Sequence, residues 1–144
     1  MRISKRLFHA VEAVLYIAYN GASDCIGSKE IAEKQGTTPR YLEQVMQKLV
    51  KSGILRGVRG PSGGYLLARE KRRISIADIY IAISEEEVDY NSTELGQKIL
   101  QPVMDSMQEL LTQRAGEITI ADLYNRAIEL SVAKTAKNED NFTI

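Results

Sequence analysis

A glycine-rich segment at residues 56–65 limits most strongly what this chain can fold into. It reads RGVRGPSGGY, and two apolar runs, Ile54–Leu55 and Tyr65–Leu67, flank it. Glycines around a Pro-Ser pair, set between two such runs, predict a β-hairpin with a loop longer than two residues. A phosphate-binding P-loop would need Gly-Lys-Ser/Thr between a strand and a helix, and this segment has neither. The sequence therefore predicts a hairpin that carries two arginines, Arg56 and Arg59.

The residues before the hairpin have the spacing of a helix-turn-helix. Ser28 is expected to cap a short helix that ends at Gly36. Thr38-Pro39 then opens a second helix that ends before Gly53, because proline suits the first helical position. Its apolar residues fall on one side, and its outer face is polar and basic. A helix-turn-helix followed by a hairpin predicts a mainly α fold with a small β-hairpin wing, the winged helix-turn-helix.

A long amphipathic helix is predicted beyond this domain, from Glu94 to about Arg114, with a bend at Pro102. Its apolar stripe is broad enough to bury against a second copy of the chain, which would make it a dimerisation helix. The alternative is that the helix packs back on its own domain. The stripe consists of Leu95, Ile99, Leu100, Val103, Met104, Met107, Leu110 and Leu111.

The predicted organisation has three parts. Residues 1–83 form the winged domain, residues 84–132 hold an acidic loop, the long helix and a short C-terminal helix, and residues 133–144 form a flexible tail. The sequences Ser75-Ile-Ala-Asp78 and Thr119-Ile-Ala-Asp122 both resemble capping boxes. We interpret them as shared helix-start chemistry and not as an internal repeat.

Charge is divided unevenly along the chain although its net value is zero. Residues 1–73 carry 14 Lys/Arg and 6 Asp/Glu, a net of +8, and residues 74–144 carry 5 and 13, a net of −8. A basic first half indicates a surface for a polyanion such as nucleic acid. The sequence has no apolar run of membrane-spanning length, so we expect a cytoplasmic protein with no membrane partner.

One histidine and one cysteine leave little material for catalysis or for a metal centre. We therefore expect neither an enzyme nor a bound cofactor. The cysteine, Cys25, is either a redox switch or an ordinary structural thiol, since nothing near it in the sequence clearly favours the thiolate. The acidic residues from Glu85 to Asp89 could hold a hard cation, but we interpret them as a solvated loop.

The wing segment also resembles a known family. Residues 53–68, together with Leu42-Glu-Gln and residues 74–79, look like the Rrf2 family of bacterial transcription regulators, and the resemblance covers about residues 1–125. It implies a homodimer, expected to act as a repressor on a palindromic operator. A winged helix that binds proteins is the alternative from a different class, because a fold alone does not fix function.

The resemblance also implies roles for single residues. The helix at residues 38–52 would enter the major groove of double-stranded DNA, and the wing at residues 56–65 would reach the minor groove through Arg59. Arg40 would pair with a guanine edge, and Glu43 would accept from a cytosine amino group. The full predicted DNA-binding set is Ser28, Lys29, Thr38, Pro39, Arg40, Tyr41, Glu43, Gln44, Lys48, Arg56, Arg59, Gly60 and Ser62.

The sequence departs from well-known members of that family where they bind an iron–sulfur cluster. Those members carry three cysteines between the fourth helix and the long helix, whereas residues 85–101 contain neither cysteine nor histidine. We therefore expect regulation without such a cluster. A small effector, a partner protein or oxidation of Cys25 is left open as the signal.

Overall fold

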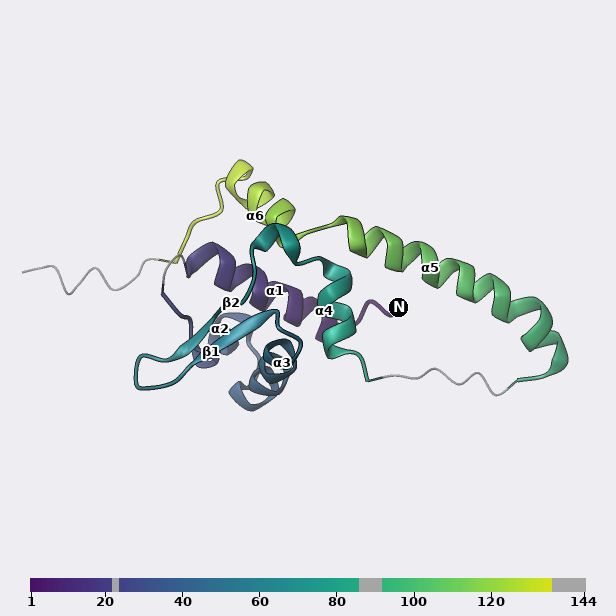
Figure 1. The fold of residues 1–144 in the computed structure, drawn as a ribbon, viewed down its shortest axis with the longest axis horizontal. Coiled ribbons are helices and arrows are strands. Elements are labelled where there is room, and N and C mark those ends of the chain that lie inside the picture. Colours follow the sequence, from purple (N-terminus) through teal and green to yellow (C-terminus); the bar gives the residue numbers. More distant parts are fainter. Residues whose placement is uncertain (22–23, 86–91, 136–144) are drawn as a thin grey trace, which may run out of the picture.

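A computed structural model describes residues 1–21, 24–85 and 92–135 (Figure 1). It is mainly helical with one antiparallel hairpin, so the predicted fold class is confirmed. None of the helices in the described ranges is both long and apolar enough to cross a membrane. The elements are α1 (Lys5–Asn20), α2 (Ser28–Gln35), α3 (Pro39–Lys51), β1 (Leu55–Val58), β2 (Gly64–Leu67), the 3-10 turn η1 (Lys71–Arg73), α4 (Ile76–Ile83), the π-helical turn η2 (Gly96–Leu100), α5 (Gln101–Glu117) and α6 (Ile120–Glu129).

Helix α1 lies at the centre of the core and contacts α4, α6 and β2. Ala10, Ala13 and Val14 on α1 are fully buried. Their small side chains let the neighbouring elements approach the helix closely. The core includes Ile120 at the start of α6, so a residue from beyond the long helix completes the core of the winged domain. The other fully buried large side chains include Ile31, Leu42, Leu49, Ile54, Ile74 and Ile79.

The helix-turn-helix forms as predicted, with one correction at its start. Thr38 caps α3, where its side-chain oxygen accepts a hydrogen bond from the Tyr41 N–H at 3.2 Å. Ser28, by contrast, is not the cap of α2. Gly27 occupies that position with an extended backbone, and its carbonyl accepts from the Ile31 N–H, which makes Ser28 the first helical residue. Gly36 ends α2 in the left-handed conformation that glycine adopts easily.

The wing is a two-stranded hairpin with Leu55 opposite Leu67 and Val58 opposite Gly64. Residues 59–63 form its loop. An isolated bridge between Ile26 and Tyr65 adds a third segment beside β2, with backbone hydrogen bonds of 3.0 and 2.8 Å. The wing is therefore fixed to the loop that precedes α2.

The long helix extends away from the rest of the molecule (Figure 1). Near Pro102, where a bend was predicted, the structure has a π-helical turn, η2, that ends two residues before the proline. Proline has no N–H for the usual bond to the fourth residue back, and its ring would collide with that carbonyl. The wider turn accommodates this, and the Gln101 N–H donates to Gly96 five residues earlier.

The chain then returns to the winged domain. Helix α6 packs against α1 and η1. The carbonyl of Val132 accepts from the Tyr19 hydroxyl, and the Thr135 N–H donates to Asn20, so residues 132–135 follow the end of α1. Of the predicted flexible tail, residues 136–144 lie outside the described ranges, as do residues 86–91 of the predicted acidic loop.

Candidate nucleic-acid interface

Helix α3 presents a largely polar face to solvent because most of its apolar side chains point inward, Val50 excepted. Leu42, Val45, Met46 and Leu49 are buried. The exposed side includes the predicted base-contacting residues Arg40, Glu43 and Gln44, with Gln47 and Lys51 beside them. Thr38 and Pro39 are exposed at the N-terminus of the helix, the end that a recognition helix directs toward base edges.

Tyr41 has a different placement from its predicted neighbours. It is half-buried, and its ring meets the ring of His9 on α1 edge-on, with centroids 5.8 Å apart. Its hydroxyl lies 3.4 Å from His9 Nδ1. Tyr41 therefore connects α3 to α1 in this structure, and His9, the one histidine of the sequence, is its packing partner.

Lys48 takes part in an ion-pair network that the sequence did not reveal. Its ammonium pairs with the carboxylate of Glu85, whose other oxygen lies 3.7 Å from the guanidinium of Arg6. The pKa of Lys48 is lowered, mainly because the side chain is desolvated and secondly because the positive charge of Arg6 is nearby. Helix α3 is thereby joined to α1 and to Glu85, the first glutamate of the predicted acidic loop.

The wing places its predicted residues at an exposed tip. Arg59, Gly60 and Ser62 are exposed, as is Arg56 on β1. Gly60 has a φ of 115°, which only glycine adopts without strain, and its carbonyl accepts from the Gly63 N–H at 2.9 Å. This closes the turn tightly behind Arg59.

The recognition helix and the wing lie on the same side of the molecule, below α1 in Figure 1. Strand β1 packs directly against α3. Burial and, to a smaller extent, the negative charge of Glu43 on α3 raise the pKa of the Tyr65 hydroxyl. Lys29 is exposed at the start of α2, and Ser28 is half-buried beside it. The predicted residues are therefore exposed or half-buried on α2, α3 and the wing, with Tyr41 turned toward α1 and Lys48 paired with Glu85.

Cys25 lies beside the loop of the wing. The thiol is half-buried and donates a hydrogen bond to the carbonyl of Ser62 at 2.9 Å. The next residue, Ile26, forms the bridge to Tyr65 described above. Two adjacent residues, Cys25 and Ile26, therefore contact the loop of the wing and its strand β2. The sequence spacing could not show this relationship.

A helix-turn-helix followed by an arginine-bearing hairpin defines the winged-helix class of DNA-binding proteins. The chain belongs to the Rrf2 family of transcription regulators: the family model, described as an iron-dependent transcriptional regulator, matches residues 3–126. It is a DNA-binding transcription regulator and not an enzyme, as expected from its sequence.

Similar proteins of known identity include transcription regulators. The chain is 32% identical to the transcriptional regulator IscR of Cronobacter sakazakii over 96% of its own length and 90% of the relative's. Among solved structures it is similar to T. potens IscR, with a TM-score of 0.75, 30% identity and 94% coverage of both chains. It is also similar to the oxidized form of Staphylococcus aureus CymR, with a TM-score of 0.70, 26% identity and coverage of 86% and 96%.

The iron in the family description raises the question of whether these residues fit an iron–sulfur cluster. Such clusters are held by several cysteine thiolates, in some centres with histidine. This chain has one cysteine, Cys25, which contacts the wing, and one histidine, His9, which contacts Tyr41. In the part of the chain that the structure describes, no three His, Cys, Asp or Glu side chains gather into a metal-binding group. The residues do not fit a thiolate-bound cluster.

Proposed function

We propose that this regulator is a homodimeric repressor that binds a palindromic DNA site without an iron–sulfur cluster. The observation that carries the proposal is the division of the surface. A face of polar and basic residues on α3 and the wing lies on one side of α1, and an exposed apolar helix extends from the other (Figure 1). A DNA-bound bacterial regulator of this kind would act in the cytoplasm.

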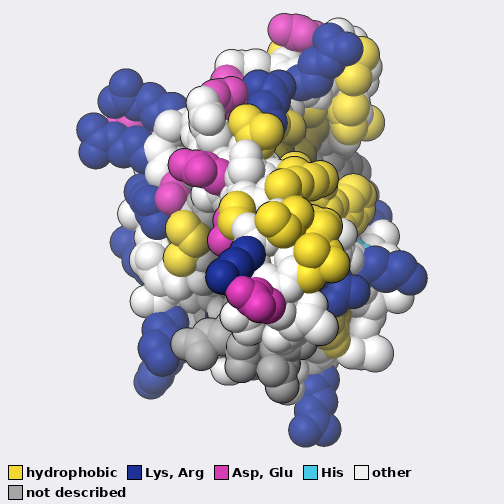
Figure 2. Space-filling view, turned by 90° about the vertical axis from the view of Figure 1, so that its right-hand side faces the viewer, with side chains coloured by type: hydrophobic (Ala, Val, Ile, Leu, Met, Phe, Trp, Pro, Cys, Tyr) yellow, Lys and Arg dark blue, Asp and Glu magenta, His cyan; other side chains and the backbone are white. Residues whose placement is uncertain are grey.

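The exposed helix supports the dimer. The eight apolar side chains of its stripe are 40–69% exposed, so their own domain leaves much of their surface uncovered. Figure 2 shows hydrophobic side chains gathered in one patch on this side of the molecule. A continuous apolar patch of this kind marks a protein interface, and a two-fold axis through it would present two wings to a palindrome.

The polar and basic face on α3 and the wing supports specific DNA binding. Arg40 and Glu43 would meet guanine and cytosine edges in the major groove, and Arg59 would enter the minor groove. Lys29, Lys48 and Arg56 would contact phosphates, which fix the position of the protein without specifying sequence. Binding should therefore weaken as salt rises, because phosphate contacts release counterions.

Fluorescence anisotropy with the DNA upstream of the protein's own gene tests this interface. Arg40→Ala and Arg59→Ala should each weaken specific binding about 10-fold or more, since a good base contact contributes about 1–3 kcal/mol. Arg126→Ala is the matched control, because this exposed arginine lies on α6 and pairs with Glu129 of the same helix. Unchanged affinity for DNA in both wing and helix variants would favour a protein-interaction module instead.

Sedimentation of the full chain tests the dimer. Met107→Glu combined with Leu110→Glu places two charges in the stripe and should convert a dimer into a monomer. Thr112→Glu is the control, since helical periodicity places Thr112 on the opposite face of α5. A wild-type chain that sediments as a monomer at all concentrations would contradict the proposal.

Oxidation of Cys25 is a second candidate for the regulatory signal. Its thiol donates to the wing at Ser62, so a change in the oxidation state of the sulfur would alter a contact in the loop of the DNA-binding hairpin. Peroxide should then change DNA affinity in the wild type and not in Cys25→Ser. An equal response in both proteins would remove this candidate.

A further inference from the structure

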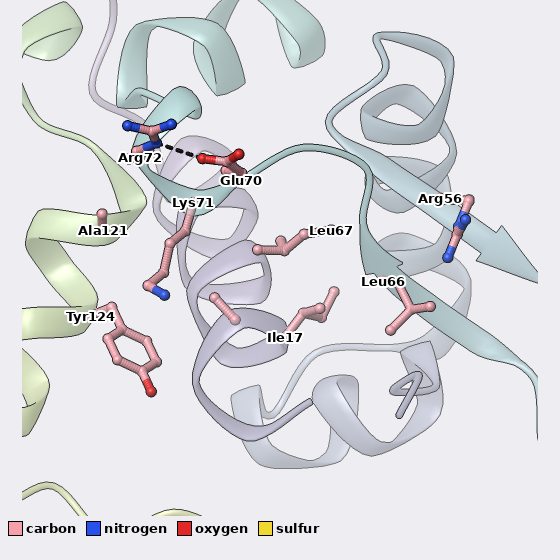
Figure 3. Close-up of a pocket in the computed structure, with 10 residues that line it drawn as sticks. Ile17, Arg56, Leu66, Leu67, Glu70, Lys71, Arg72, Ala121 and Tyr124 are labelled. Atoms are coloured by element: carbon pink, nitrogen blue, oxygen red, sulfur yellow. Dashed lines mark hydrogen bonds and ion pairs between the residues drawn. The ribbon is translucent and has the colours of Figure 1, made fainter. Parts of the chain in front are cut away.

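A pocket of about 760 Å³ opens between the wing and the C-terminal helix α6 (Figure 3). It lies apart from the apolar stripe of the long helix, and it shares one residue, Arg56, with the predicted DNA-binding set. Its volume lies in the range of pockets that hold small organic molecules. Four elements meet around it, since α1, the hairpin, η1 and α6 all contribute lining residues.

The floor of this pocket is apolar. Ile17 of α1 and the strand residues Leu66 and Leu67 lie together there (Figure 3). Both leucines are half-buried, so part of their surface faces the pocket and is open to solvent. A ligand with an apolar body would remove this surface from water, which favours binding.

Charges surround that floor, and they do not cancel. Glu70 and Arg72 pair with each other at 2.5 Å, and this contact lowers the pKa of the Glu70 carboxyl, which stays ionised. Arg56 and Lys71 add two positive charges, and neither forms an ion pair with any residue that the structure describes. The pocket therefore has an excess of positive charge.

The Lys71 ammonium is also held in place. It lies 4.5 Å from the ring centroid of Tyr124 on α6, within the range of a cation–π interaction. Figure 3 shows Lys71 and Tyr124 together on the α6 side of the pocket, with Arg56 on the far side of Leu66. Two cations thus stand at opposite sides of an apolar floor.

We propose that this pocket binds a small organic acid, a carboxylate with an aromatic or aliphatic body. The carboxylate would pair with Lys71 or Arg56, and the body would lie on Ile17, Leu66 and Leu67. A neutral molecule of the same shape would leave both cations without a partner and would bind less tightly.

The pocket is placed to affect DNA binding, a step that rests on the proposed function. Leu66 and Leu67 belong to the strand that leads from the wing tip, and Tyr124 belongs to α6. A bound acid would contact both, so it would favour one position of the wing relative to α6. Coupling is reciprocal, so DNA and the acid must change each other's affinity by the same factor.

Heteronuclear NMR of the full-length chain tests the site without any DNA. Benzoate, phenylacetate and hexanoate are titrated at millimolar concentrations against their neutral amides. The acids should shift backbone signals around Leu66, Lys71 and Tyr124, and the amides should bind about tenfold more weakly. If none of the three acids binds, if acid and amide bind equally, or if the shifts map elsewhere, the proposal is overturned.

Two variants and a control sharpen the result. Lys71→Gln should weaken acid binding, and Ala121→Phe should block it by filling the pocket from α6. Arg126→Gln removes a positive charge from α6 outside the lining residues and should bind the acid as the wild type does. Circular dichroism confirms that each variant is folded. Equal binding by the control and by Lys71→Gln would overturn the assigned role of that ammonium.

DNA anisotropy with and without phenylacetate then tests the coupling. A shift in DNA affinity that disappears in Ala121→Phe supports regulation through the pocket. Acid binding with no effect on DNA affinity would overturn the regulatory step and leave the site itself established. Failure to bind any DNA would instead overturn the proposed function, and the NMR result would be unaffected.

Discussion

Ser75 and Thr119 face each other in an antiparallel bridge, and each caps the helix that follows it. The Ser75 hydroxyl accepts from the Asp78 N–H at 3.0 Å, and the Asp78 carboxylate accepts from the Ser75 N–H at 2.9 Å. Thr119 and Asp122 repeat this reciprocal pair at 3.1 and 2.9 Å. Two capping boxes thus lie side by side.

Backbone hydrogen bonds join the two boxes. The Ile76 N–H donates to Ile118 at 3.0 Å, and the Ile120 N–H donates to Ile74 at 2.8 Å. Ile74 and Ile120 are both fully buried. This bridge fixes the end of the long helix to the winged domain, so the proposed dimer helix and the DNA-binding face share a rigid connection.

Removing the hydroxyl of Thr119 should destabilise this connection. We expect Thr119→Ala to lower the free energy of unfolding by about 1 kcal/mol, the usual loss for a helix cap. Ser75→Ala should do the same, and the double variant should depart from additivity because the residues are in contact. Urea denaturation measures all three. Ser106→Ala, an exposed serine within α5, is the control, and losses no larger than its own would contradict a capping role.

Acidic pH should weaken the capping box formed by Thr119 and Asp122. Hydrogen bonds from the backbone and the hydroxyl of Thr119 lower the pKa of Asp122 below 3.8. Because the folded pKa is below the unfolded one, the stabilisation is fully present above the unfolded pKa and is lost as pH falls through the folded pKa.

The comparison of wild type with Asp122→Asn measures this effect. The difference in unfolding free energy between them should be constant above about pH 5 and should shrink as the pH falls below 4. Glu117→Gln, at the exposed end of α5, provides a carboxylate control. A difference that stays the same down to acid pH would show that Asp122 does not act through its ionised form.

The sequence predicted the local elements of this fold well, because their signals are local. The Gly-Pro-Ser turn between apolar runs defined the wing, and Thr38-Pro39 defined the start of α3. The two similar capping sequences at Ser75 and Thr119 were also visible. Their pairing in space was not, since it depends on the return of the chain after the long helix and no local pattern encodes it.

The contacts of the site residues with distant parts of the chain were likewise not predictable from local sequence patterns. Exposure of Arg40 and Arg59 followed from periodicity and from the turn, but the inward orientation of Tyr41 depends on His9, a residue of α1. The ion pair of Lys48 with Glu85 likewise joins segments far apart in the sequence. The cap of α2 was predicted one residue late, because serine is the commoner cap and Gly27 serves here through its backbone alone.

Releasing Lys48 from Glu85 should strengthen DNA binding. In the free protein the Glu85 carboxylate holds an ammonium that would otherwise meet a phosphate. Glu85→Gln should therefore tighten binding by a factor of about two to five, in line with a partly exposed ion pair of up to about 1 kcal/mol. The dependence of log affinity on log salt should also steepen by about one phosphate contact.

The control for this variant is Glu94→Gln, which breaks the exposed ion pair with Lys98 at the other end of the acidic segment. It changes the net charge by the same amount but lies away from α3. If both variants raise DNA affinity equally, the effect comes from overall charge and not from Lys48.

Two glycines of the wing should respond very differently to the same substitution. A Cβ added at Gly64 would lie 2.5 Å from the backbone carbon and oxygen of Ile26 and 2.8 Å from the nitrogen of Gly27. Backbone atoms cannot rotate away as a side chain can, so the Ile26–Tyr65 bridge would have to open. At Gly57, on the paired strand, an added Cβ would meet nothing within 4 Å.

We therefore expect Gly64→Ala to lower the free energy of unfolding by about 1–3 kcal/mol, as overpacking does, and Gly57→Ala to leave it nearly unchanged. Gly64→Ala should also weaken DNA binding, because a wing detached from Ile26 no longer holds Arg59 at a fixed distance from α3. Urea denaturation and anisotropy on the same two proteins separate stability from binding. Equal behaviour of the two variants would show that the bridge does not position the wing.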